Sequence, residues 1–183
     1  GLLDEGNLLN RYIRNTNITG VYEQVGGTCY AYAACSAYLN TIARIYGAKK
    51  PFPSFRECYD IACYNGENGG KSEESIRRLE KRFRYGVLWE QCDNLSIRDA
   101  LTISVIISFK TSQKGWECVA NGSLLEFPGG KPTGFHAAVV EGYDFDKDCV
   151  ILKNSWGGET ASPRFNFTGS AAHETKILRV FYT

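Results

Sequence analysis

A buried helix that begins with a cysteine is the feature that most constrains this chain. Small and apolar residues recur at three- and four-residue steps over residues 29–46, and Gly47 supplies a stop signal. Cys29 opens this helix behind Gly26 and Gly27. The positive end of the helix dipole and the unpaired N–H groups there lower the pKa of a thiol and favour the nucleophilic thiolate. Free cysteines are also often buried, so this stretch alone fits a nucleophile or a packed cysteine equally well.

The other expected helices precede about residue 100. Capping residues predict short helices after Ser54, at Ser72 and after Ser96, and a short helical piece is expected near residues 8–13.

The expected strands follow about residue 100. Apolar runs predict strands at 103–109, 116–120, 135–143, 149–153 and 176–182, whereas 157–175 is expected to be mostly loop. An Asp-rich turn makes 135–143 and 149–153 a hairpin. This segregation predicts an α+β fold with two lobes and a cleft between them. We expect one domain over 1–183, with a helical lobe at about 25–100 and a β-rich lobe at about 101–183 that includes part of 1–24.

Composition excludes several classes of protein. With 183 residues, 43% of them hydrophobic, the chain suits one compact domain. A formal charge of +1 gives no indication of a nucleic acid or an anionic membrane as partner. No apolar run reaches membrane-spanning length and residues 1–20 have no signal-peptide pattern, so we expect a mature fragment.

Cysteines and glycosylation sequons suggest a cellular route. Seven cysteines fit one reactive thiol and up to three disulfides, in any of 15 pairings. Four sequons begin at Asn17, Asn94, Asn121 and Asn166. We therefore expect a secreted or lysosomal/vacuolar glycoprotein, with a cytosolic protein holding free thiols as the alternative. Two histidines and no C-x-x-C motif predict no metal site, and we expect no cofactor.

A base for Cys29 must be one of two histidines. His136 starts a strand, whereas His173 lies in an Ala-, Ser- and Gly-rich stretch read as loop. Asn154 ends the partner strand of the hairpin, so it should lie beside His136, where its amide can accept the imidazole N–H and orient the ring. Trp156 can shield that hydrogen bond from water. Each residue alone is more common as structure, but the three together favour nucleophilic catalysis.

Three segments carry a resemblance to a known family. Residues 24–33, 134–143 and 151–157 resemble the signature segments of the papain-like (cathepsin-type) cysteine proteases, and Lys-Asn-Ser-Trp-Gly is the most specific run. Asn68-Gly69-Gly70 is similar to the family's glycine pair, whose backbone binds extended substrate.

The resemblance implies a catalytic set. Cys29 would be the nucleophile, His136 the base and Asn154 the orienting residue, while Gln24 would donate to the oxyanion beside the Cys29 N–H. A thiolate–imidazolium pair and an acyl-enzyme intermediate are expected.

The resemblance also implies how substrate binds. The expected substrate-binding residues are Gly69, Gly70, Lys71, Gly134, Phe135 and Trp156. Lys71 indicates tolerance for an acidic side chain or simply points to water. Expected partners are a peptide or protein substrate and a pro-segment or protein inhibitor, with neither nucleic acid nor membrane, and we expect a monomer.

Departures from the family pattern indicate a distant, shortened member. Gln24 precedes Cys29 by five positions instead of six, and Gly26 replaces a family cysteine. His136 follows Cys29 by 107 residues, fewer than the roughly 130–150 typical of the family. The resemblance implies a Cys58–Cys92 disulfide. We also expect Cys118–Cys149, with Cys35 and Cys63 unassigned.

The predicted function is peptide-bond hydrolysis by a thiol peptidase. Two alternatives stay open: a catalytically inactive papain-like scaffold used for binding or regulation, and a papain-like acyltransferase or amidase.

Overall fold

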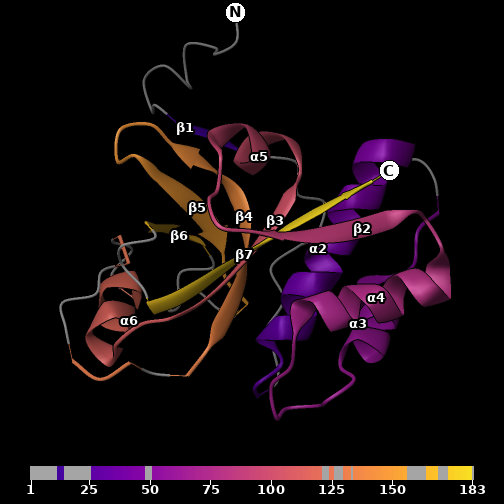
Figure 1. Ribbon diagram of the computed structural model, residues 1–183, viewed down its shortest axis with the longest axis horizontal. Helices are drawn as coiled ribbons and strands as arrows, with labels where there is room; N and C mark the ends of the chain where they lie inside the picture. Colours follow the sequence, from indigo (N-terminus) through magenta and orange to yellow (C-terminus); the bar gives the residue numbers. More distant parts are fainter. Residues whose placement is uncertain are drawn as a thin grey trace, which may run out of the picture.

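The structure of the protein is a computed structural model that describes residues 12–14, 26–47, 51–120, 124–125, 130–132, 134–155, 164–168 and 173–182 (Figure 1). Its elements, in chain order, are β1 (Tyr12–Arg14), α2 (Cys29–Tyr46), α3 (Phe55–Ala62), α4 (Ser72–Phe83), β2 (Val87–Cys92), α5 (Ile97–Thr102), β3 (Ser104–Lys110), α6 (Gln113–Ala120), β4 (His136–Asp144), β5 (Cys149–Lys153), β6 (Arg164–Phe167) and β7 (His173–Tyr182).

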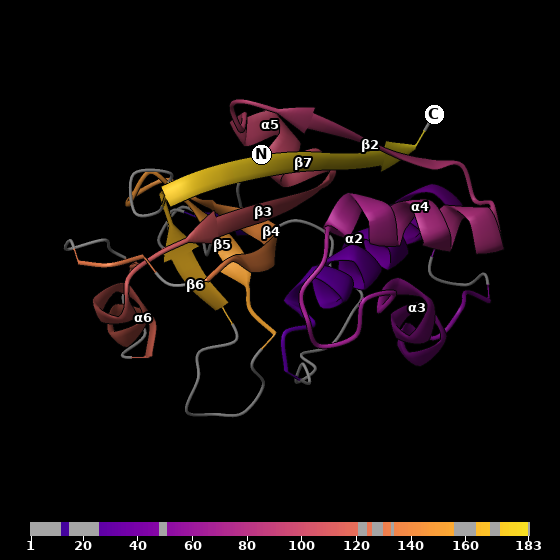
Figure 2. The same cartoon turned by 60° about the horizontal axis from the view of Figure 1, so that its bottom comes forward.

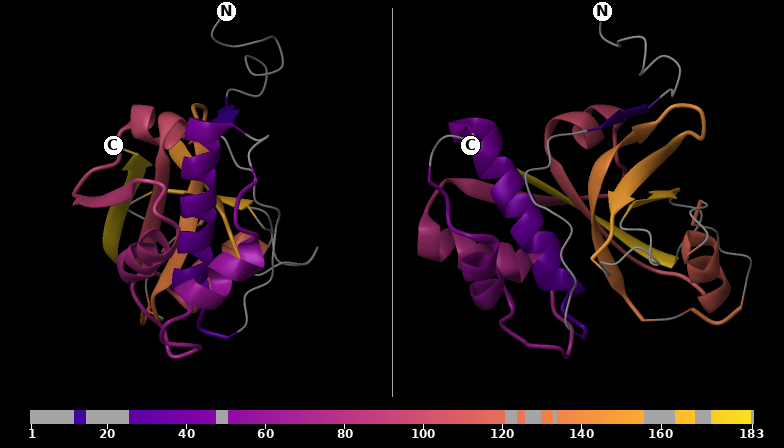
Figure 3. Two further views of the ribbon diagram at one scale, coloured as in Figure 1. Left: turned by 90° about the vertical axis from the view of Figure 1, so that its right-hand side faces the viewer. Right: turned by 180° about the vertical axis from the view of Figure 1, so that it is seen from behind.

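The described strands form one antiparallel sheet. Its order is β2-β7-β3-β4-β5-β6, and β1 pairs with β4 from outside this path. Helices α2, α3 and α4 gather at one side of the molecule, and α2 contacts both the other two helices and the sheet (Figures 1 and 2). The view from behind shows α2 running between the sheet and the other helices (Figure 3). The fold is therefore α+β, as the sequence predicted.

Two hydrophobic cores lie on opposite faces of the sheet. Because successive strand residues point to opposite faces, Ile106 of β3 joins the core shared with α2, α3 and α4, while Val105 and Ile107 join the other core. In β4, Val139 and Ala138 divide in the same way. The helical side therefore packs on one face of the sheet, and α2 is held rigidly against the start of β4.

The main helix and the hairpin confirm the sequence prediction. Helix α2 spans residues 29–46 and ends before Gly47, which has φ of 77°. Ser54 and Ser96 cap α3 and α5, with each hydroxyl accepting from the backbone N–H three residues ahead. The Asp-rich turn joins β4 to β5, and Asp144 accepts two backbone N–H groups of that turn.

Several local predictions are wrong. Residues 116–120 belong to helix α6 instead of a strand, because Trp116 and Val119 pack one helical face onto the second core. Residues 12–13 lie in strand β1, 164–167 form β6, and His173 begins β7. Strand β2 was not predicted. Ser72 is the first helical residue and not the cap, and its hydroxyl donates to the Tyr30 carbonyl.

The predicted disulfides are also wrong in this structure, where all seven cysteines are free thiols. Cys58 lies in the core shared by the helices, whereas Cys92 packs against the core on the other face of the sheet. Cys118 donates to the Lys114 carbonyl of its own helix instead of pairing with Cys149.

Among the described residues, no helix is both long enough and apolar enough to span a bilayer.

Candidate active site

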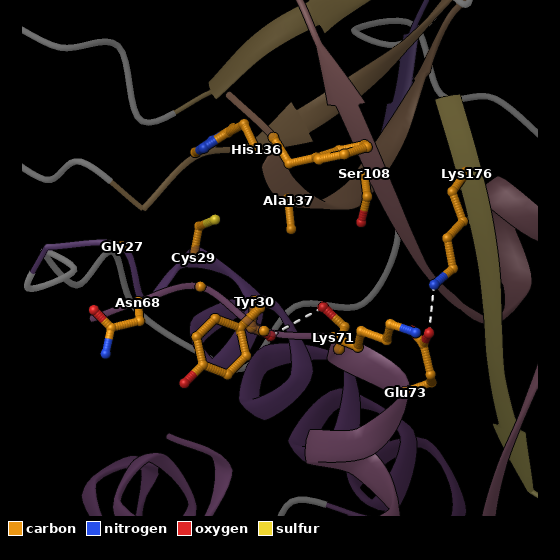
Figure 4. A pocket seen from close by; sticks show the side chains of 14 residues that line it. Gly27, Cys29, Tyr30, Asn68, Lys71, Glu73, Ser108, His136, Ala137 and Lys176 are labelled. Atoms are coloured by element: carbon orange, nitrogen blue, oxygen red, sulfur yellow. Dashed lines mark hydrogen bonds and ion pairs between the residues drawn. The ribbon is translucent and has the colours of Figure 1, made fainter. Parts of the chain in front are cut away.

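A pocket of about 570 Å³ lies where the first turn of α2 meets the start of β4 and the segment before α4 (Figure 4). Its lining residues are Gly27, Cys29, Tyr30, Asn68, Gly69, Gly70, Lys71, Ser72, Glu73, Ser108, Phe135, His136, Ala137 and Lys176. The pocket thus brings together residues from distant parts of the chain.

Cys29 is the first residue of α2 and its side chain points to the side of the pocket that carries His136 (Figure 4). Burial raises the pKa of the Cys29 thiol, while backbone hydrogen bonds with Ala137, Tyr30 and Cys29 itself lower that pKa. Ala137 directly follows His136 in β4. The contact with Ala137 therefore holds the sulfur against the start of β4, next to the histidine.

His136 is the first residue of β4 and is only 6% exposed. Aromatic rings meet the imidazole edge to face, Phe109 at 5.9 Å and Trp116 at 5.1 Å between centroids. Burial lowers the pKa of His136 to about 4, and the hydrogen bond with Asn154 opposes that shift. The ring is thus held in place and is neutral at pH 7.

Asn154 fixes the tautomer of His136. Its Oδ1 lies 2.7 Å from Nε2 of His136 and accepts the backbone N–H of Ser155 at 2.9 Å. Because the Ser155 N–H can only donate, the atom that it meets must be the amide oxygen, and Nε2 must carry the proton that Oδ1 accepts. In the neutral ring the other nitrogen, Nδ1, is then the basic one.

The burial of Cys29 and His136 bears on the expected ion pair. Burial acts against the charged form of each side chain taken singly. A thiolate–imidazolium pair would therefore form only through mutual stabilisation of the two charges, which the backbone hydrogen bonds to the sulfur favour. That ion pair stays a prediction.

The segment with the glycine pair is held close to the start of α2. Gly27 and Asn68 form a parallel bridge, and a Cβ on Gly27 would lie 2.4 Å from the Glu67 carbonyl oxygen. A Cβ on Gly70 would lie 2.7 Å from the Tyr30 ring. Gly69 has φ of 80°, which favours glycine. These three glycines therefore permit the close approach that forms one wall of the pocket.

Tyr30 positions that wall, and sequence reasoning did not single it out for this role. Its hydroxyl donates to the Gly66 carbonyl at 2.9 Å and accepts the Asn65 N–H at 3.1 Å. The Ser72 hydroxyl donates to its carbonyl at 3.0 Å. Tyr30, the residue after the thiol, is thus hydrogen-bonded to both ends of the 65–72 segment. Its position next to Cys29 is the sequence feature that could have indicated this role.

The structure locates most of the predicted site residues. The pocket includes Cys29, His136, Gly69, Gly70, Lys71 and Phe135, and Asn154 lies fully buried behind His136. Phe135 is 57% exposed at the rim, with the Lys110 ammonium 4.6 Å from its ring centroid. Gly134 is exposed and does not line the pocket. Gln24 and Trp156 lie outside the described residues, so their predicted roles stay predictions.

Four lining residues lie outside both the predicted site residues and the segments that carry the resemblance: Ser72, Glu73, Ser108 and Lys176. No short motif marks them, because they come from β3, α4 and β7 and meet only in the folded chain. Among the described residues, no group of three or more His, Cys, Asp or Glu side chains is arranged to hold a metal ion.

The α+β architecture, with Cys29 at the start of α2 facing the β4–β5 hairpin, is the papain-like cysteine protease fold. Solved structures that share it include three cysteine proteases. Xylellain, a cysteine protease from Xylella fastidiosa, has 18% identity and a TM-score of 0.68 over 98% of this chain and 90% of its own. The bromelain protease from Ananas comosus, in complex with the E64 inhibitor, has 15% identity and a TM-score of 0.65 over 90% of this chain and 94% of its own. A Carica candamarcensis cysteine protease, in complex with E-64, has 19% identity and a TM-score of 0.59 over 91% of this chain and 93% of its own.

Sequence comparison adds no closer relationship: no family model matches the chain, and no curated protein matches it. The likeness to known proteins is thus a likeness of fold.

Proposed function

We propose that this protein is a cysteine peptidase that hydrolyses peptide bonds through an acyl-enzyme intermediate. The observation that carries the proposal is the 2.7 Å contact between Nε2 of His136 and Oδ1 of Asn154. It leaves Nδ1 as the basic nitrogen of a ring that lines the same pocket as the Cys29 thiol. Bromelain and the Carica candamarcensis protease, which share the fold, are described with an inhibitor bound.

Acylation begins when Nδ1 of His136 takes the thiol proton and the sulfur of Cys29 attacks the carbonyl carbon of the substrate. The negative charge that develops on the carbonyl oxygen is stabilised by the Cys29 N–H at the helix terminus and, in this proposal, by the Gln24 amide. His136 then gives its proton to the leaving amine as the C–N bond breaks. The product is a thioester on Cys29.

Deacylation uses the same base. Nδ1 of His136 takes a proton from water as the water oxygen attacks the thioester carbonyl, and the C–S bond breaks. The sulfur recovers the proton and the carboxylic acid product leaves. Asn154 keeps the imidazole oriented through both halves, because Oδ1 holds the Nε2–H throughout. The backbone of Gly69 and Gly70 holds the extended substrate across from His136.

A labelling and hydrolysis experiment tests the function. Iodoacetamide should modify Cys29 well before the other six thiols, as read by peptide mass spectrometry, and Cys29→Ala should abolish hydrolysis of a fluorogenic peptide. Cys118→Ala is the matched control, because Cys118 lies in α6 outside the pocket and should be dispensable. Unchanged hydrolysis in Cys29→Ala would refute the proposal.

One observation favours a second candidate, a catalytically inactive binding scaffold. Burial acts against charge on both Cys29 and His136, and a neutral pair is a weaker nucleophile. The pH dependence of alkylation separates the two candidates. A peptidase should show rapid alkylation of Cys29 well below pH 8, whereas a scaffold should show the slow alkylation of an ordinary buried thiol.

A further inference from the structure

One end of the pocket carries charge that peptide hydrolysis itself does not need. Glu73 in the first turn of α4 and Lys176 on β7 line this end, and Lys71 precedes α4 beside them. In Figure 4 these three side chains lie on the side of the pocket away from the Cys29 and His136 side chains. Their placement indicates a role in choosing the substrate.

Lys176 and Glu73 form an ion pair that joins the sheet to the helices. Nζ of Lys176 donates to Oε1 of Glu73, and the two side chains are 29% and 17% exposed. The pair is therefore only partly screened by water. An ammonium has three donor hydrogens, so the contact with Glu73 leaves Lys176 able to bind a second acceptor.

The charges at this end do not cancel. Lys71 and Lys176 contribute two positive charges and Glu73 one negative charge. Lys71 forms no ion pair with any other residue that the structure describes. The neighbouring lining residues Ser72 and Ser108 are neutral and small. A carboxylate that enters here meets two ammonium groups, whereas a cation must first displace Lys176 from Glu73.

We propose that this end of the pocket selects substrates with a carboxylate side chain, aspartate or glutamate, at a residue one position removed from the cleaved bond, because this end lies away from Cys29 and His136 (Figure 4). Lys176 is the specificity-determining residue, Lys71 adds to the positive potential and Glu73 holds Lys176 in place. The inference rests on the proposed peptidase function, since it concerns the same pocket.

Hydrolysis of matched peptides tests the inference. Fluorogenic peptides that differ only in Glu, Gln or Lys at that residue should give kcat/KM in the order Glu, Gln, Lys, with Glu about tenfold above Gln, the effect typical of a charge-assisted hydrogen bond. Lys176→Met should reduce the Glu-to-Gln ratio to near one. Lys147→Met, in the exposed turn after β4, should leave the ratio unchanged. Higher kcat/KM for the Lys peptide, or an unchanged ratio in Lys176→Met, would overturn the inference.

A binding measurement separates this inference from the proposed function. Calorimetry on Cys29→Ala with the same peptides reports selection without chemistry. Tighter binding of the Glu peptide, lost in Cys29→Ala/Lys176→Met, supports the selection even if the protein with Cys29 hydrolyses nothing. Equal binding of all three peptides overturns it even if hydrolysis occurs.

Discussion

Nε2 of His136 lies 2.7 Å from Oδ1 of Asn154, and the amide oxygen is identified by the backbone N–H of Ser155, which it also accepts. Asn154 is fully buried, and its Nδ2 has no hydrogen-bond partner in the described part of the chain. The amide is therefore held by its oxygen alone. Leaving this buried donor without a partner lowers the stability of the folded protein. The same arrangement holds the imidazole in one tautomer and one orientation.

Asn154→Ala should reduce kcat by about 10–100-fold, because a freely rotating imidazole rarely presents Nδ1 to the thiol. Steady-state kinetics with a fluorogenic peptide checks this, and the ¹⁵N shifts of the ring should show mixed tautomers in the variant. Asn166→Ala is the control, since Asn166 donates to Asp144 at the far end of the hairpin. A kcat for Asn154→Ala equal to that of the original protein would remove the orienting role.

Acid should destabilise the protein through His136. Its pKa falls from 6.5 to about 4 on folding, so the unfolded chain binds the proton more readily and the folded state loses stability as the pH falls. The contribution is complete above pH 6.5 and lost progressively between 6.5 and about 4, up to about 3 kcal/mol.

Urea unfolding at pH 7 and at pH 4 measures this loss. The drop in the free energy of unfolding should be smaller in His136→Gln, which lacks the titrating ring. Equal drops in the two proteins would show that burial of His136 does not control acid stability.

Gly27→Ala should destabilise the protein by roughly 1–3 kcal/mol, because the added Cβ forces the 65–70 segment away from α2. The nearest atom is the backbone carbonyl oxygen of Glu67, which cannot move aside by a change of side-chain rotamer. Thermal unfolding provides the measurement. Gly134→Ala is the stability control, since a Cβ there meets no atom within 4 Å. Equal melting temperatures for Gly27→Ala and the original protein would contradict the packing.

Glu80 should be the most important carboxylate for holding α4 against β2. It accepts the hydroxyl of Tyr38 at 3.0 Å and the backbone N–H groups of Tyr85, Gly86 and Val87 at 3.0, 2.9 and 3.2 Å. Glu80→Ala should cost roughly 2–3 kcal/mol, since these donors lose a charged acceptor. Glu117→Ala, on an exposed position of α6, is the comparison. Denaturant unfolding with similar midpoints for both variants would contradict the prediction.

Thiol titration in denaturant without reductant should detect all seven cysteines. The reason is spatial, since Cys58 and Cys92 lie in cores on opposite faces of the sheet. Titration of the reduced protein is the control. A thiol count that is lower by two or more than that of the reduced protein would show that the protein forms disulfides.

Local signals predicted much of the fold and the contact between His136 and Asn154. The buried pattern of residues 29–46 and the stop at Gly47 define α2 without help from the rest of the chain. A turn of four residues between two apolar strands brings His136 and Asn154 together, because a hairpin pairs the start of one strand with the end of the other. These predictions succeeded because few residues separate the interacting parts.

Where local patterns were ambiguous, packing decided the structure. Residues 116–120 read as a strand, yet the second core holds Trp116 and Val119 on one helical face, so they belong to α6. The family resemblance led to a disulfide at Cys58, but this chain buries that thiol in the helical core. Short apolar runs fit the residue spacing of a helix and of a strand equally well, and the residues they pack against in the folded protein decide which one forms.

By itself, then, the sequence determined that a thiol lies at the helix terminus and that His136 lies beside Asn154, since helix periodicity and hairpin geometry depend on residues that are close together in the chain. Only the tertiary structure decided which charges line the end of the pocket away from the thiol (Figure 4). Lys176 and Glu73 are 103 positions apart, and nothing local brings them together. Their contact depends on β7 pairing beside β3 and on α4 packing against α2, because burial of the two apolar faces sets where these elements lie.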